Sequence, residues 1–331
     1  MIYNRPEYWL AKTETVVPYL TFSSPSSFTL AVGDATKHWD GTLEYSTDTS
    51  TWSTWDGTAT LSSAISGSDN VLYLRGTGNT VIGYYDEADT EKYIPWKING
   101  TDVRCDGNIE TLLDYATVES GQHPMMAEED CFGGLFMGCT ALITPPELPA
   151  TTLKDYCYVH MFEGCTSLTQ APVLPATTIA EDCYDDMFNG CTSLTQAPAL
   201  PAIKLASSCY DGMFRGCTNL TQAPALPAKI LASYCYNDMF SGCTSLKQAP
   251  ALPATTLVSS CYCGMFKGCT SLKLSSTQTG EYTQEYRIPS SGIGTTTPDA
   301  LNDMFTNTGG TFTGTPSINT TYYLSNINTV V

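Results

Sequence analysis

The feature that most constrains this chain is a phrase of 20 residues that recurs six times, always 26 residues apart. Its consensus reads Cys-Tyr-x-x-Met-Phe-x-Gly-Cys-Thr-Ser-Leu-Thr-Gln-Ala-Pro-Ala-Leu-Pro-Ala, and no residue is inserted or lost between repeats. Such strict spacing means that each unit must match the geometry of its neighbour, which is typical of a stacked solenoid. Solenoids mostly present surfaces, so the repeat favours binding over chemistry.

The charge of the chain is strongly negative and unevenly placed. The net charge is −18, and residues 101–186 alone hold 15 acidic and 2 basic side chains. Nucleic-acid binding needs clustered lysine and arginine, so that class of partner is excluded. The acidic region could attract a cation or a basic partner, although a solvated face is the simpler interpretation.

No targeting signal is recognised at either end of the given sequence. The start has no apolar segment of signal-peptide length, and no stretch approaches the roughly 20 apolar residues of a membrane span. The expectation is therefore a protein without a classical signal peptide that resides in a virion or on an extracellular surface.

Twelve of the 14 cysteines belong to the repeat. Their spacings of 8 and 18 residues do not match zinc sites, and three histidines are too few to complete such sites. Because cysteine behaves as a small buried hydrophobe, we predict two structural ladders of buried thiols. Oxidation between coils stays open as an alternative, since coils about 4.8 Å apart are within disulfide range. The ladders comprise Cys131, Cys157, Cys183, Cys209, Cys235 and Cys261, and Cys139, Cys165, Cys191, Cys217, Cys243 and Cys269.

Two further cysteines, Cys105 and Cys263, lie outside the ladders. Cys263 occupies a place held by Asp or Asn in the three preceding repeats, so we expect it to be exposed.

The part before the repeat predicts a small all-β domain. After an irregular arm at residues 1–17, residues 18–98 contain short alternating segments separated by turn signals, typical of a β-sandwich. Strands are predicted at 42–46, 51–55, 58–61, 71–75 and 80–84. Residues 99–126 would cap the first coil, with Asn108 capping a short helix through residue 115.

Six coils are predicted from residue 127 to 274. In each, a segment such as 168–171 would form a short parallel strand, ending where Pro172 lacks an N–H. The segment from the first cysteine to the glycine would form one helical or 3₁₀ turn with Met and Phe inward. Gly164 and its equivalents would end that turn in the left-handed conformation.

The C-terminal part, 275–331, predicts an insertion, a degenerate seventh coil and a cap. The tetrapeptide at 302–305 repeats the Asn-Asp-Met-Phe of 237–240, but it follows the sixth coil after an interval longer than one period. A strand-like run falls at 281–288, and a final strand is expected at 321–324. The fold class is thus β-rich and multi-domain, a β-sandwich followed by a leucine-rich-repeat-like solenoid.

The segment Phe-x-Gly-Cys-Thr-Ser-Leu-Thr, whole at residues 162–169 and 188–195, resembles the BspA-like leucine-rich repeats of bacterial surface proteins and gut phages. The similarity covers about residues 127–274; a Met before the Phe and a longer coil depart from the family pattern. The resemblance implies adhesion or ligand binding and carries no catalytic residues.

No catalytic constellation is present in the sequence. The three histidines fall in different segments without a nucleophile motif, and no phosphate loop or zinc-protease helix occurs. Asp155, Asp182, Asp185 and Asp186 lack the spacing of a calcium loop, so neither a metal nor a cofactor is expected.

Binding residues are predicted where the repeats differ, because varied residues on a fixed scaffold form recognition surfaces. Unconstrained solvent positions would look the same. Two tryptophans three apart add a possible sugar platform, one of them core and the other exposed. The candidate ligand-binding residues are Trp52, Trp55, Val159, His160, Asp185, Asp186, Asp211, Arg215, Asn237 and Asp238.

Together these features favour a non-enzymatic attachment protein, foremost a phage virion accessory such as a fibre or head decoration. Its partners would be a host-surface or mucus glycan or protein, and other virion proteins. A bacterial BspA-like surface adhesin and a glycan-binding accessory module of an enzyme system are the alternatives.

Overall fold

The computed structural model describes residues 17–33, 39–83, 85–86, 89–124, 129–288, 291–292 and 299–325. Over these residues the chain is β-rich, with one helix of nine residues, and none of its sheets closes into a barrel. That helix is too short to cross a bilayer, and the described residues contain no other. The predicted N-terminal arm lies outside the described residues, except for Val17.

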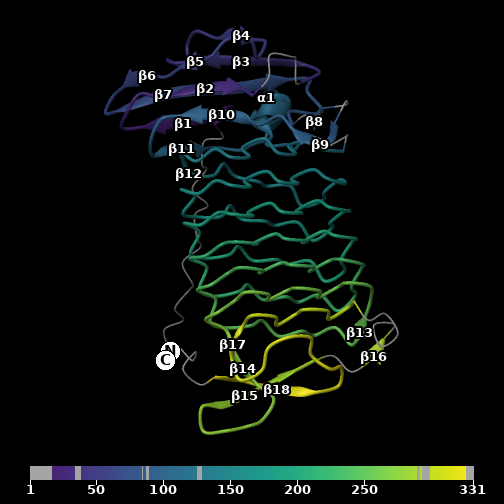
Figure 1. Ribbon diagram of the computed structural model, residues 1–331. Helices are drawn as coiled ribbons and strands as arrows, with labels where there is room; N and C mark the ends of the chain where they lie inside the picture. Colours follow the sequence, from purple (N-terminus) through teal and green to yellow (C-terminus); the bar gives the residue numbers. More distant parts are fainter. Residues whose placement is uncertain are drawn as a thin grey trace, which may run out of the picture.

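Two sheets, formed mostly by strands that precede the repeats, lie at one end of the molecule, in purple and blue at the top of Figure 1. The first runs β12 (Leu142–Thr144), β11 (Val103–Asp106), β1 (Leu20–Ser24), β7 (Asp69–Thr77), β3 (Thr42–Ser46) and β4 (Ser53–Trp55), with β6 (Ala64–Ser66) also on β7. The second runs β10 (Trp96–Asn99), β2 (Thr29–Val32) and β5 (Leu61–Ser62), and a separate pair joins β8 (Tyr85–Asp86) to β9 (Asp89–Tyr93).

Aromatic side chains pack between the two larger sheets. Trp55 of β4 meets Trp96 of β10 edge to face, with ring centroids 5.8 Å apart, and both are buried. The predicted strands at 42–46 and 71–75 are confirmed, the second as part of the longer β7. The segments predicted at 51–55 and 58–61 overlap β4 and β5, which begin later.

The strand predicted at 80–84 is wrong over the described residues 80–83. The N–H groups of Ile82 and Gly83 both donate to the Cys131 carbonyl instead of forming a sheet ladder. A Cβ on Gly83 would lie 2.4 Å from the Gly133 carbonyl oxygen, so this segment approaches the repeat backbone closely. Only glycine allows that approach.

Helix α1 (Thr111–Glu119) begins and ends later than predicted. Asn108 does not cap α1 itself, whose N-cap residue is Glu110; the Asn108 Oδ1 accepts from the Glu110 N–H and so caps the turn that precedes the helix. Asp114 interrupts the helix with extended backbone angles, and its Oδ1 accepts from the Thr117 N–H at 2.8 Å. A carboxylate that accepts from the N–H two or three residues later is an N-cap. Asp114 therefore caps the second part of α1, which begins after it.

The repeats form a stack of units joined by a regular backbone ladder. In residues 156–164, alternate N–H groups donate to carbonyls of the next unit; the Phe162 N–H donates to the Met187 carbonyl at 3.0 Å. The N–H groups between them close turns within their own unit, as when Glu163 donates to the His160 carbonyl at 3.0 Å. The predicted helical or 3₁₀ turn is therefore wrong. Since half of the N–H groups are used between units, no helix can continue.

Left-handed residues occur at every fourth place of this segment. In the second unit they are Tyr156, His160 and Gly164, with φ of 59°, 52° and 71°. The predicted left-handed glycine is confirmed in all six units, where its φ lies between 69° and 77°. Because each left-handed residue reverses the chain, side chains alternate in pairs, two inward and two outward.

The inward side chains make one continuous core. The repeated Cys, Tyr, Met, Phe and Leu are buried, and all of them belong to one cluster that also contains residues of both N-terminal sheets. Successive Phe rings from Phe136 to Phe305 stack nearly parallel at 5.5–5.7 Å. The inward orientation predicted for Met, Phe and Leu is confirmed.

The short parallel strand predicted in every unit forms only at the ends, as β12 and β14 (Lys273–Ser275). Between them an isolated bridge joins Gln222 to Gln248, and the Thr169 N–H donates to Ile143 at 3.2 Å. Pro172 and its equivalents cannot donate, so the ladder stops after one or two bonds. Further short pairings join the segments that lie between the Pro-Ala-Leu-Pro-Ala part of one repeat and the first cysteine of the next. There β13 (Thr256–Leu257) pairs with β16 (Ser291–Gly292).

The first unit is capped by more of the chain than the predicted segment 99–126. Strand β11 pairs in parallel with β12, and the Ile109 N–H donates to Glu147 at 3.0 Å. Residues 82–83 and Trp96, both before position 99, also donate to this unit. The N-terminal sheets therefore continue directly into the stack.

The last unit continues the ladder after an insertion. The Phe266 N–H donates to the Met304 carbonyl at 2.9 Å, as the predicted seventh coil requires. A four-stranded sheet closes this end: β15 (Tyr282–Arg287), β18 (Thr321–Ser325), β14 and β17 (Gly309–Gly310). The strands predicted at 281–288 and 321–324 are confirmed as β15 and β18.

All 14 cysteines are free, and the 12 ladder thiols are buried as predicted. Burial raises the pKa of Cys191 to about 12, and its Sγ–H donates to the Phe162 carbonyl. Cys263 is half-buried, with burial and then Asp238 raising the pKa of its thiol.

We therefore expect Ellman's reagent to titrate about one thiol in the native protein at pH 8, and all 14 in denaturant. Cys263→Ser should abolish the native signal, whereas Cys191→Ser should leave it. Rapid titration of several native thiols would contradict the buried ladders.

Candidate functional site

The varied residues gather on one side of the stack, which we call the turn side: the outward side chains of residues 130–138, the first unit, and their equivalents. Within each unit the outward places are the first, fourth, fifth, eighth and ninth of nine residues. At the fourth, fifth and eighth places of units two to five, the half-buried side chains that carry charge or an amide are His160, Glu163, Asp185, Asp186, Asn189, Asp211, Arg215, Asn237 and Asp238.

The fifth place is restricted by its backbone. Its φ is positive in every unit, from 46° at Asp238 to 61° at Gly134. Left-handed angles favour Gly, and Asn, Asp and His more than other residues. Along the stack the residues are Gly134, His160, Asp186, Gly212, Asp238 and Gly264. The variation here has a structural cause, so the fourth and eighth places are the freer ones.

At the fifth place, two aspartates are each followed by a glycine in the next unit. A Cβ on Gly212 would lie 2.0 Å from Asp186 Oδ1, and one on Gly264 would lie 2.1 Å from Asp238 Oδ1. Each carboxylate thus lies over the glycine of the next unit.

This arrangement predicts a difference between two glycine variants. Gly138→Ala meets no atom within 4 Å and should cost about 1 kcal/mol for its left-handed φ of 73° alone. Gly212→Ala should cost about 2 kcal/mol, because it must also displace the Asp186 carboxylate. Urea unfolding measures both; equal losses would contradict the packing of Asp186 over Gly212.

His160 is held by a carboxylate of its own unit. Its Nδ1 lies 2.7 Å from Glu163 Oε2, and the Asn189 amide donates to Glu163 Oε1 at 3.1 Å. Burial would lower the pKa of His160, but Glu163, Asp185 and Asp186 together outweigh it and raise the pKa. Tyr93 of β9 packs beside the ring at 5.5 Å and donates to Asp130. Tyr93 therefore bounds the site toward the N-terminal sheets.

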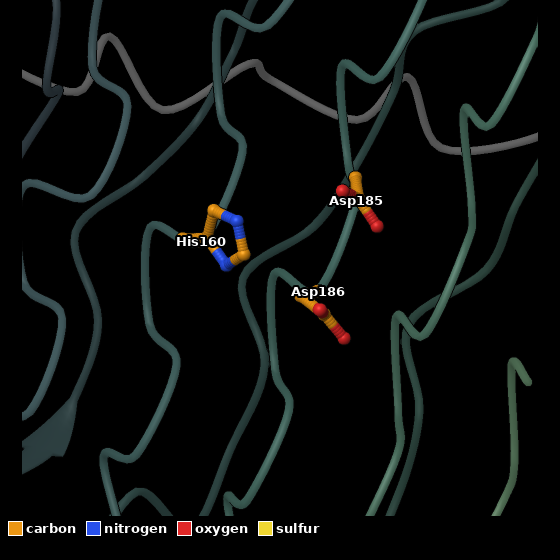
Figure 2. Close-up of side chains that lie close together, drawn as sticks. All are labelled: His160, Asp185 and Asp186. Carbon is orange, nitrogen blue, oxygen red and sulfur yellow. The ribbon is translucent and has the colours of Figure 1, made fainter. Parts of the chain in front are cut away.

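Asp185 and Asp186 stand beside His160 on the next unit (Figure 2). One ligand atom from each of the three residues lies within 4.8 Å of the others. Burial, followed by the charges of Asp186 and Asp211, raises the pKa of Asp185 to about 8. Burial also raises the pKa of Asp186, although Arg215 partly offsets this.

Arg215 lies among three carboxylates from successive units. Its guanidinium nitrogens are 3.8 Å from Asp186, 3.7 Å from Asp211 and 3.7 Å from Asp238. Burial raises the pKa of Asp211 to about 6, while the Asn237 amide, donating at 3.0 Å, and Arg215 oppose the rise. Asp186 Oδ1 and Arg215 Nε are buried without a hydrogen-bond partner. The single positive charge of Arg215 is thus shared by three carboxylates.

His160, Asp185 and Asp186 are the described residues that could hold a metal, as one nitrogen and two oxygen donors. Arg215 would compete with such a metal for the negative charge of Asp186.

Three predicted candidates do not contribute a free surface. Trp55 is buried between the sheets and its Nε1 donates to Ala59 at 2.8 Å, and Val159 is also buried. Trp52 is half-buried as well, with Arg75 4.0 Å above its ring and Tyr19 beside it. Trp55 is therefore the core member of the pair, as expected for one of the two tryptophans, and it cannot bind a sugar. Trp52 is half-buried instead of exposed, because Arg75 and Tyr19 pack against its ring. The other seven candidates lie together on the turn side.

Prediction from the repeat pattern missed Glu163, Asn189 and Tyr93. Glu163 follows His160 by three residues and occupies the eighth place, so its variation among repeats was an available signal. Tyr93 had none, since only the fold brings β9 against the second unit.

Comparison with known proteins adds no relative: no family model, curated protein or solved structure matches this chain.

Proposed function

We propose that this chain is a non-enzymatic recognition protein that attaches to a host surface, and that its turn side is the binding surface. In this proposal the stack is a leucine-rich-repeat-like solenoid of the BspA-like kind, following a β-sandwich-like part. The attachment protein would belong to a phage virion, as a fibre or head decoration.

The crowded carboxylates of the turn side carry the proposal. Asp185, Asp186 and Asp211 have raised pKa values through burial and, to a smaller extent, repulsion by neighbouring carboxylates, so holding them there costs stability. The interior of the same units is nearly invariant and is formed by apolar side chains, cysteines and tyrosines instead of carboxylates. Local conflicts confined to one surface of a well-packed scaffold are expected at functional sites.

The test separates binding from stability. Labelled full-length protein would be tested on intact gut bacteria and immobilised mucin, with the variant Asp185→Asn/Asp211→Asn. We expect this variant to be at least as stable as the wild type but to bind at least tenfold more weakly. The matched control is Glu181→Gln, an exposed acid outside the crowded group.

The binding test uses the whole chain, because the core and the backbone hydrogen bonds join the N-terminal sheets to the first repeat unit. A fragment that contained only the sheets or only the repeats would expose buried side chains. Unchanged binding by the double variant would exclude the turn side. Absence of the protein from purified virions would contradict the virion context while leaving the binding result intact.

A further inference from the structure

One side of the stack is formed by the five residues that precede the turn side in each unit. We call it the Thr-Thr side, because the first two of the five residues are both threonine in three of the five segments. Parallel backbone bridges join the first segment to the second and the third to the fourth, so equivalent residues lie side by side. Strand β13, in the fifth segment, marks this side at the right of Figure 1. The segments are 151–155, 177–181, 203–207, 229–233 and 255–259.

The third and fourth segments replace the threonines by isoleucine and lysine. Ile203 and Ile230 are 66% and 58% exposed, and they are neighbours, since the Ile230 N–H donates to the Ile203 carbonyl. Lys204 and Lys229 are exposed beside them, and neither makes an ion pair with a described residue. We call these four residues the Ile203 patch. Adjacent exposed apolar side chains with a polar rim are typical of protein interaction sites.

The fold itself does not require this patch. The equivalent places hold threonine in the other three segments, which have the same exposed positions and the same neighbours along the stack. Threonine at both places would remove apolar surface from water without loss of a packing contact. Something that covers the isoleucines therefore accounts for them better than the stability of the stack does.

The charges of the Thr-Thr side show which partner fits. The first segment holds one acid and one base, the second only Glu181, the third and fourth one lysine each, and the fifth no charge. The wider chain repeats this asymmetry: residues 101–186 hold 15 acidic and 2 basic side chains, whereas residues 187–331 hold 6 and 7. A second copy lying in the same direction would place lysines against lysines. A copy lying in the opposite direction places lysines against acids, which is favourable.

We propose that the Ile203 patch binds a second copy of this chain through a two-fold axis that crosses the third segment. The two stacks then run in opposite directions, and Ile203 packs on its own copy. Lys229 in the fourth segment faces Glu181 in the second segment of the other copy, and the axis repeats this pair. Such a self-complementary contact closes at two copies. The proposal goes beyond attachment and does not depend on it.

The size of the Thr-Thr side sets the strength of this dimer. Five residues at about 3.3 Å make the side about 16 Å wide, and five segments about 4.8 Å apart make it about 20 Å long. This face is smaller than that of a stable, standard-sized interface, so the dimer is weak. We expect a Kd on the order of 100 µM.

Sedimentation velocity of the full chain from about 10 to about 500 µM tests the dimer. We expect monomer and dimer in exchange, with less dimer in about 0.5 M NaCl, because salt screens the lysine–acid pairs. The variant Ile203→Thr/Ile230→Thr restores the threonines of the other segments, so it retains the fold and should weaken dimerisation at least fivefold. Val173→Thr is the matched control, an exposed apolar residue of the proline segment, and should leave dimerisation unchanged.

A charge exchange tests the opposite direction of the two copies. Lys229→Glu should weaken dimerisation at least fivefold, and the addition of Glu181→Lys should restore the Kd to within about twofold, because the pair forms again with its signs exchanged. A chain that stays monomeric to about 500 µM, an isoleucine variant that dimerises like the wild type, or a charge exchange without rescue would overturn the proposal.

The dimer and the attachment function are tested apart. A dimer with a Kd on the order of 100 µM is dissociated at the micromolar protein concentrations of the cell-binding and urea measurements. Glu181→Gln therefore remains a control in those measurements. Failure of the sedimentation test leaves the turn-side proposal standing, and unchanged cell binding by the turn-side variant leaves the dimer standing.

Discussion

Phe188→Ala is expected to destabilise the protein by about 3–5 kcal/mol, as deletion of a fully buried ring does elsewhere. Phe188 is 0% exposed and lies between Phe162 and Phe214, with ring centroids 5.7 and 5.6 Å away. The variant would leave a cavity in the middle of the stack. The neighbouring units cannot close it, because their backbone ladder fixes the spacing between them.

Urea unfolding followed by far-ultraviolet circular dichroism measures this loss. Val173→Ala is the control, since Val173 is 79% exposed and should change the free energy of unfolding by less than about 0.5 kcal/mol. A loss below about 1 kcal/mol for Phe188→Ala would mean that the stacked rings do not form the core. If the free energy of unfolding of Phe188→Ala also decreases less steeply with urea concentration than that of the wild type, the two halves of the stack unfold separately.

The sequence predicted the interior of the repeat well because burial is periodic. A residue such as Phe162 or Leu168 recurs at the same place in each unit, and a side chain that must fit between two copies of itself tolerates little change. The left-handed glycines were predictable for the same reason, since few other residues accept that backbone.

The path of the chain between those residues was not predictable from the period alone. A spacing of Cys-Tyr-x-x-Met-Phe suits one helical turn as well as two linked turns, because both place the paired residues on one side. The choice depends on the ladder to the next unit, which the Tyr158 and His160 N–H groups enter. Local sequence does not show which N–H groups will find their acceptors in the neighbouring unit.

The candidate site was half predicted. Variation between repeats found Asp185, Asp211 and Arg215, but it also selected His160 and Asp186, whose place is restricted by a positive φ. The tryptophans were overestimated, since burial of Trp55 and the stacking of Arg75 on Trp52 depend on strand pairing.

Asp185→Asn should stabilise the protein at pH 8 by about 2–3 kcal/mol and have little effect at pH 4. The folded pKa of Asp185 is about 8, far above its ordinary value of 3.8, so the folded state retains a proton that the unfolded state releases. A pKa difference of one between the two states corresponds to about 1.4 kcal/mol, and we count half because the carboxylate is partly exposed and coupled to its neighbours.

The sign follows from proton linkage. A carboxyl group whose pKa is raised on folding contributes stability that is full below the unfolded pKa and is lost as pH rises through the folded pKa. Asp211, with a pKa of about 6, and His160, whose pKa is also raised, act in the same direction. The wild type should therefore lose stability from about pH 4 to pH 8, unlike a protein whose carboxylates are stabilised by ion pairs.

Urea midpoints measured at pH 4, 6 and 8 decide the matter, with Glu181→Gln as the matched control outside the crowded group. Asp185→Asn should flatten the decline, because an amide has no proton to release as pH rises. If the wild-type midpoint instead increases toward pH 8, the acids of the turn side are compensated by charge in solution. If Asp185→Asn both flattens the dependence of the urea midpoint on pH and weakens binding to cells, the Asp185 carboxylate lowers the stability of the protein but is needed for recognition.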